Sequence, residues 1–146
     1  MSPATLPSKS DLIARLAAHA TIGGVPPREL EWVATHGEFL DVLPGDRVGH
    51  KGAPLPGMVV MLTGRVEATL DRGTGRRFTL ASDGGELTAH LPYSRAQQLL
   101  FDIVAVQPTQ AVLIRRELFP ELIRECPAIV EIAVHVMLER TRLMTS

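Results

Sequence analysis

A glycine, a glutamate and an arginine that could together hold a phosphorylated ligand lie close together in the middle of the chain. Gly85-Glu86-Leu87 is followed by Arg95 nine residues after the glutamate, and then by Ala96. An arginine can donate two parallel hydrogen bonds to phosphate oxygens, and glycine lets a backbone approach a ligand closely. In an arbitrary sequence, an arginine near a Gly-Glu turn is more often a solvated surface residue, and a glutamate at a helix start is favoured by the helix dipole alone. The residues by themselves leave both interpretations open.

Other residues that could do chemistry do not group. The histidines are dispersed, and none forms a His-x-His or His-Glu-x-x-His grouping: His19, His36, His50, His90 and His135. A cupin-like metalloprotein would need convergent histidines, and His50 and His90 are the two that could meet in space. Ser94 and Cys126 lack a recognisable nucleophile context, and Cys126 before Pro127 is expected to pack as a small apolar residue. We therefore expect no catalytic residue, no bound metal and no required cofactor.

Composition predicts one soluble domain. The chain has 146 residues, a net charge of −1 and a single cysteine, which excludes a disulfide scaffold and a strongly basic nucleic-acid binder. No stretch approaches the roughly 18 apolar residues that a membrane span needs. The N-terminus, MSPATLPSKSDL, lacks the charged start and apolar run of a signal peptide. We expect a cytoplasmic protein that binds neither membrane nor nucleic acid.

The first part of the chain, residues 10–37, is predicted to be helical. Ser10 can cap a helix whose apolar face includes Leu12 and Leu16. Pro27 stands where the first turn of a second helix tolerates proline, and Gly37 ends that helix.

The middle part, residues 38–115, is predicted to be a barrel or sandwich of short antiparallel strands, because turn residues recur at short intervals. Met58–Leu62 and Arg65–Leu70 are interpreted as a hairpin with Gly64 at its tip, and Val66 and Ala68 as its buried face. Further strands are expected at 77–81, 102–106 and 110–114.

The last part, residues 116–146, returns to helix. A short helix over 116–125 is followed by Cys126-Pro127 and a long helix with an apolar stripe: Ile129, Ile132, Ala133, Val136 and Leu143. The stripe predicts either packing on the chain's own barrel or a dimer seam or link to a following domain. The pattern alone leaves these alternatives open.

This order of elements resembles the cyclic-nucleotide-binding domain, as in bacterial catabolite activator proteins and the regulatory subunits of cyclic-AMP-dependent kinase. The resemblance rests on segments whose order and spacing match: 25–30, 43–48, 50–52, 61–67 and 114–119. It implies one domain over 1–146, mainly β with flanking helices: an eight-stranded jelly-roll-like β-roll (a double-stranded β-helix) with short N-terminal helices and a long C-terminal helix.

The family binds its ligand in a phosphate-binding cassette, where a Gly-Glu-Leu run opens a short helix, the glutamate holds the ribose hydroxyl and an arginine pairs with the cyclic phosphate. The resemblance therefore implies that cAMP or cGMP is bound by Gly85, Glu86, Leu87, Arg95 and Ala96. An apolar wall is expected from Leu62, Val66, Val104 and Ala105. The sequence departs from the family at 90–94 and inserts residues at 97–101. A pocket retuned to another small ligand and a purely structural cassette therefore remain alternatives.

The implied function is a regulatory sensor and not an enzyme. A bound cyclic nucleotide would order the cassette, and the C-terminal helix would relay the change to an effector domain such as a kinase, or to a partner protein. The segment 91–95 resembles variants in bacterial sensor kinases, and the long helix predicts a homodimer. Because the chain ends at Thr145-Ser146, with no room for a helix-turn-helix, direct DNA binding is not expected. The alternatives are a divergent β-roll that acts as a dimerisation or interaction module without a nucleotide, and the cupin-like metalloprotein.

Overall fold

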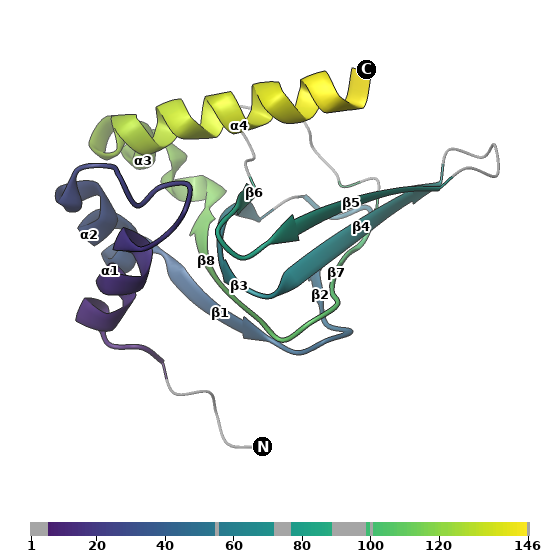
Figure 1. Ribbon diagram of the computed structural model, residues 1–146, viewed down its shortest axis with the longest axis horizontal. Coiled ribbons are helices and arrows are strands. Elements are labelled where there is room, and N and C mark those ends of the chain that lie inside the picture. Colours follow the sequence, from purple (N-terminus) through teal and green to yellow (C-terminus); the bar gives the residue numbers. More distant parts are fainter. Residues whose placement is uncertain (1–5, 55, 72–76, 89–98, 100, 146) are drawn as a thin grey trace.

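The computed structural model describes residues 6–54, 56–71, 77–88, 99 and 101–145. Helices α1 (Lys9–Ala17), α2 (Pro27–His36) and α3 (Phe119–Glu125) gather at one end of the sheets, and helix α4 (Pro127–Thr145) extends from there across the molecule (Figure 1). The helices that the sequence predicted in the first and last parts of the chain are therefore present.

Eight strands in the described part of the chain form two antiparallel sheets. The first has the order β1 (Glu38–Val42), β8 (Thr109–Arg115), β3 (Gly57–Thr63) and β6 (Leu87–Thr88). The second has the order β2 (Arg47–Gly49), β7 (Ile103–Ala105), β4 (Arg65–Asp71) and β5 (Arg77–Asp83). The mainly-β class with flanking helices is therefore confirmed.

The prediction of a hairpin at Gly64 is wrong, because β3 and β4 belong to different sheets. Strand β3 pairs with β6 and β8, whereas β4 pairs with β5 and β7. Gly64 has a φ of +93°, and a Cβ at this position would lie 2.4 Å from the Thr109 hydroxyl oxygen. Glycine at position 64 thus permits a tight corner at which the chain crosses from one sheet to the other.

The two predicted N-terminal helices are present, with one change of cap. Ser8, and not Ser10, caps α1: its hydroxyl accepts a hydrogen bond of 3.1 Å from the backbone N–H of Asp11. Helix α2 has proline in its first turn and ends before Gly37, as predicted.

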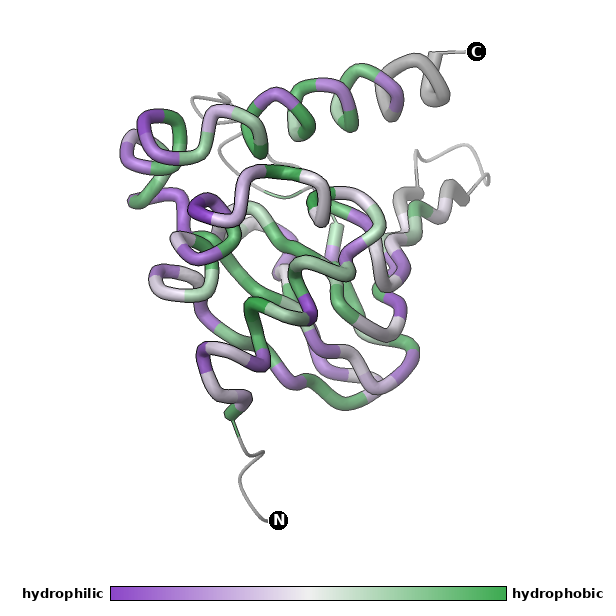
Figure 2. Tube along the Cα trace, turned by 60° about the vertical axis from the view of Figure 1, so that its left-hand side comes forward, coloured by the Kyte–Doolittle hydropathy of each residue, from purple (hydrophilic) through white to green (hydrophobic). Residues whose placement is uncertain are grey.

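The hydrophobic core has two parts. One lies between the helices and the first sheet and includes Leu16, Trp32 and Ile129. The smaller one joins the two sheets and contains Met61, Val66, Ala105 and Ala111. In Figure 2 the hydrophobic segments lie mainly along the strands and the inner helix faces. The predicted alternation along β4 is correct where it is described, because Val66 and Ala68 are both buried.

The C-terminal part begins with a 3₁₀ turn at Arg116–Leu118 and continues through α3 into α4. Along the predicted stripe, Ile129 and Ala133 are buried, and Ile132 and Val136 pack against the core. This half of the stripe therefore packs on the chain's own fold, while the Leu143 side chain lies outside the described part. Cys126 is fully buried, as expected, and its burial, above all, raises the pKa of the thiol to about 12.

Over the described ranges, no helix combines the length and the apolar character that crossing a membrane requires.

Candidate functional site

The turn between β5 and β6 contains the first predicted binding residues. Gly85 has a φ of +90°, a left-handed conformation that glycine adopts without strain. Glu86 donates its backbone N–H to the carbonyl of Asp83 at 3.1 Å, which closes the turn, and Gly84 donates to the carbonyl of Gly64 at 3.0 Å. We call residues 83–86 the β5–β6 turn.

Strand β3 holds this turn through two backbone hydrogen bonds. Gly85 donates its N–H to the carbonyl of Met61, and Met61 donates its own N–H to the carbonyl of Glu86, both at 2.9 Å. Because these bonds continue the pairing of β3 with β6, the turn is an extension of the first sheet.

Within the described residues, which stop at Thr88, the Gly85-Glu86-Leu87 run does not begin a helix, because Leu87–Thr88 forms strand β6. The side chain of Leu87 is 1% exposed and belongs to the core. The carboxylate of Glu86 is exposed and accepts a hydrogen bond from the backbone N–H of Asp83. This carboxylate therefore stabilises the turn in the structure, whatever else it binds.

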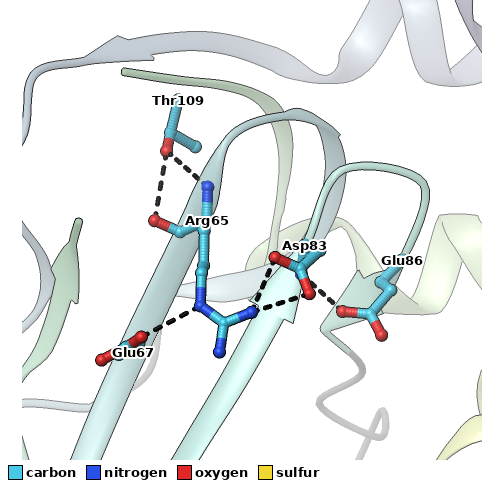
Figure 3. Close-up of polar contacts among 5 residues, drawn as sticks. All are labelled: Arg65, Glu67, Asp83, Glu86 and Thr109. Atoms are coloured by element: carbon cyan, nitrogen blue, oxygen red, sulfur yellow. Dashed lines mark hydrogen bonds and ion pairs between the residues drawn. The ribbon is translucent and has the colours of Figure 1, made fainter. Parts of the chain in front are cut away.

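Arg65, the first residue of β4, lies opposite Asp83 of β5 in the second sheet and binds its side chain (Figure 3). Its Nη1 lies 3.0 Å from both carboxylate oxygens of Asp83, and its Nε donates to Glu67 at 2.9 Å. Hydrogen bonding to Glu67, and then the contacts with Asp83, raise the pKa of Arg65. The backbone N–H of Arg65 also donates to the Thr109 hydroxyl at 3.2 Å. This network was not predicted from the sequence, although the spacing of Arg65 and Glu67 places both residues on one face of a strand.

The charges of this network are mostly negative. The carboxylates of Glu67 and Asp83 bind the guanidinium of Arg65, and the carboxylate of Glu86 lies beyond them on the backbone N–H of Asp83. A phosphate placed beside the turn would therefore need a positive charge from elsewhere. The predicted phosphate ligand, Arg95, and its neighbour Ala96 lie outside the described residues.

The segment between α1 and α2 also touches the turn, a contact that no sequence pattern signalled. His19 is 7% exposed and its Nε2 lies 2.8 Å from the carbonyl oxygen of Met61. The hydroxyl of Thr21 donates to the carbonyl of Gly85 at 2.6 Å. The N-terminal layer and the first predicted binding residue are therefore in direct contact.

The predicted apolar wall divides between different surfaces. Val66 and Ala105 are paired neighbours that both lie between the two sheets. Leu62 packs instead against the helix-covered core, next to Met61 on the opposite face of β3. Val104 pairs with Glu67, on the face opposite Ala105. Consecutive strand residues point to opposite faces, so these four residues cannot line one wall.

Within the described ranges, no group of three or more histidine, cysteine, aspartate or glutamate side chains is arranged as metal ligands. Of the two histidines that a cupin-like site would require, His90 lies outside these ranges.

Comparisons with known proteins identify the fold. No protein-family model and no curated protein matches this sequence. Among solved structures, the Thermus thermophilus catabolite activator protein matches with a TM-score of 0.71 at 20% identity, over 84% of this chain and 58% of that protein. A cAMP-binding acyltransferase from Mycobacterium smegmatis matches with a TM-score of 0.69 at 23% identity, over 88% of this chain and 40% of the other.

The regulatory domain of Toxoplasma gondii protein kinase A, solved with cAMP, matches with a TM-score of 0.71 at 14% identity, over 92% of this chain and 50% of that one. This chain thus spans about 40 to 58% of the length of these three structures. The resemblance seen in the sequence is confirmed for the fold, which is that of the cyclic nucleotide-binding domain.

Proposed function

We propose that this domain is a regulatory sensor that binds a cyclic nucleotide and relays the binding through its C-terminal helix. The observation that carries the proposal is the fold, whose similar structures include a cAMP-binding acyltransferase and a kinase regulatory domain solved with cAMP. We interpret the two sheet orders as a jelly-roll-like β-roll. The role is regulatory and not catalytic.

In this proposal Arg95 supplies the positive charge for the cyclic phosphate, with Ala96 beside it. The acidic surroundings of the β5–β6 turn support this assignment, because Arg65 is already bound by two carboxylates. Gly85 and Glu86 form the edge of the site, and Leu87 supports them from the core. One oxygen of Glu86 accepts the Asp83 N–H, so we assign the ribose hydroxyl to its other oxygen.

The relay to an effector would use α4, which is tied directly to the N-terminal helices. The buried carboxylate of Glu29 in α2 accepts hydrogen bonds from the backbone N–H groups of Ala128 and Ile129, at 3.3 and 3.0 Å. Farther along α4, the side chains of Val134 and Leu138 are 39% and 61% exposed. We propose that this face packs against a second copy or an effector domain, such as a kinase, of a cytoplasmic signalling protein.

Isothermal titration calorimetry with cAMP and cGMP tests the ligand assignment. The parent chain should bind at least one of them, and Arg95→Ala should weaken binding roughly 10- to 100-fold, because a hydrogen bond to a charged group contributes about 1.5 to 3 kcal/mol. Arg47→Ala is the matched control, since Arg47 lies on β2 and pairs with Asp102. Equal binding by the Arg95→Ala variant and the parent would remove Arg95 from the site.

A second candidate function is an interaction module that binds no nucleotide. The use of the Glu86 carboxylate to close the turn favours it, because that carboxylate already has a structural role. This alternative predicts no heat of binding with either nucleotide, together with self-association through α4.

A further inference from the structure

His19 contacts the first sheet through Nε2 and its own N-terminal segment through Nδ1. Its Nε2 lies 2.8 Å from the carbonyl oxygen of Met61, and its Nδ1 lies 3.1 and 3.2 Å from the backbone nitrogens of Thr21 and Ile22. A carbonyl oxygen only accepts hydrogen bonds and a backbone N–H only donates them. The ring is therefore neutral, with its single proton on Nε2.

The same carbonyl oxygen also binds the β5–β6 turn. The carbonyl of Met61 accepts from His19 and from the backbone N–H of Gly85, the latter at 2.9 Å. Thr21 adds a hydrogen bond of 2.6 Å to the carbonyl of Gly85. We call the contacts of His19 with Met61, Thr21 and Ile22, together with the contact of Thr21 with Gly85, the N-terminal clasp.

Protonation of the ring is incompatible with the clasp as it stands. A proton on Nδ1 would face the backbone N–H groups of Thr21 and Ile22, which are themselves donors. Burial lowers the pKa of His19 from its ordinary value, and the backbone contacts with Met61 and Glu86 act against that decrease. The neutral ring is thus the form that the fold favours.

The titratable groups on the surrounding elements are few. Strand β3 has none, the β5–β6 turn has Asp83 and Glu86, and the last turn of α1 has Arg15. Asp83 pairs with Arg65, and Glu86 accepts the Asp83 N–H. No ion pair joins His19 to any of these residues within the described part of the chain.

We propose that the N-terminal clasp is a proton-sensitive support of the ligand site, so that protonation of His19 releases the β5–β6 turn and weakens ligand binding. This inference rests on the proposed function for its second half only. An unfolded histidine takes up its proton near pH 6.5, and folded His19 does so at lower pH. The clasp therefore stabilises the fold above about pH 6.5, and its contribution is lost as the pH falls toward the folded pKa.

Amide exchange of the ligand-free chain between pH 5 and 8, corrected for intrinsic exchange rates, tests the clasp itself. The Gly85 amide should lose protection as the pH falls in the parent and in His135→Gln, a control at an exposed histidine of α4. In His19→Gln the pH dependence should disappear. Thr21→Val should lower protection at every pH while leaving the pH dependence intact. If protection of the Gly85 amide did not change with pH in the parent, or changed in the same way in the His19→Gln variant, the proposal would be overturned.

Titration of the same variants with cAMP separates the two claims. The parent and His135→Gln should bind several-fold more weakly at pH 5.5 than at pH 7.5, and His19→Gln should not. Binding of cAMP that does not change with pH in the parent would overturn the regulatory role. If no nucleotide binds at any pH, the proposed function fails, and amide exchange still decides the clasp.

Discussion

The carboxylate of Glu29 in α2 accepts a hydrogen bond of 3.0 Å from the backbone N–H of Ile129, in the first turn of α4. The two residues are 100 positions apart, and Glu29 is 1% exposed. A helix N-terminus has free N–H donors and a partial positive charge, both of which a carboxylate satisfies. A residue of the N-terminal layer thus caps the proposed relay helix.

Replacing Glu29 should destabilise the fold in a graded way. Glu29→Ala removes both acceptors and should lower the free energy of unfolding by about 1 to 3 kcal/mol. Glu29→Gln keeps one amide oxygen as an acceptor and should cost less. Urea unfolding measures both, with Glu31→Ala as the control, because Glu31 is an exposed residue of the same helix paired with Lys9. Equal effects at positions 29 and 31 would contradict a capping role.

Gly85→Ala should destabilise the β5–β6 turn through its backbone. Its φ of +90° is unfavourable for alanine, and such left-handed conformations cost about 1 to 2 kcal/mol. The added methyl group itself would fit, because its nearest neighbour, the Cβ of Ala20, lies 3.4 Å away. Gly24→Ala is the matched control, since a Cβ there meets nothing within 4 Å. Thermal melting should separate the two variants; indistinguishable melting temperatures would show that the turn conformation is not required.

Arg65 and Asp83 should be energetically coupled in a salt-dependent way. A double-mutant cycle with Arg65→Gln and Asp83→Asn should give a coupling at low ionic strength that shrinks toward 1 M NaCl, where the Debye length is about 3 Å. The effect should be small because the two side chains are 35% and 53% exposed. Arg115 and Glu38 form a comparable exposed pair on the first sheet and provide the reference cycle. Coupling that is absent even at low salt would mean that this pair does not hold the turn.

The exposed face of α4 should control self-association. Leu138→Glu places a charge on a side chain that is 61% exposed and should lower the average molar mass measured by light scattering from that of a dimer to that of a monomer. Leu43→Glu, at a residue 51% exposed at the end of β1, should leave the mass unchanged. A parent chain that is monomeric at every concentration would contradict the dimer.

The helices could be predicted because proline and glycine limit a helix locally. The pairing of the strands could not be predicted, because it depends on residues far apart in the sequence. Proline at position 27 and glycine at position 37 mark the limits of α2 correctly, because each acts through its own backbone. Gly64 has the same turn signature whether two strands pair or diverge, so the change of sheet between β3 and β4 was not visible.

The candidate site was predictable only in part, for the same reason. Glu86 closes a turn and Leu87 enters a strand because Met61, far away in sequence, pairs with this segment. Glu29 has the pattern of an ordinary first-turn residue, and His19 has no informative neighbours in sequence. Their roles depend on Ile129 and Met61, which only the folded chain brings to them.

Thermal melting with and without cAMP or cGMP tests most directly whether the domain binds a cyclic nucleotide. A ligand present at about 100 times its dissociation constant adds roughly 2.7 kcal/mol to stability, which for a domain of this size raises the melting temperature by several degrees. We predict such a shift with at least one of the two nucleotides. An unchanged melting temperature at millimolar concentrations of both would contradict the sensor proposal.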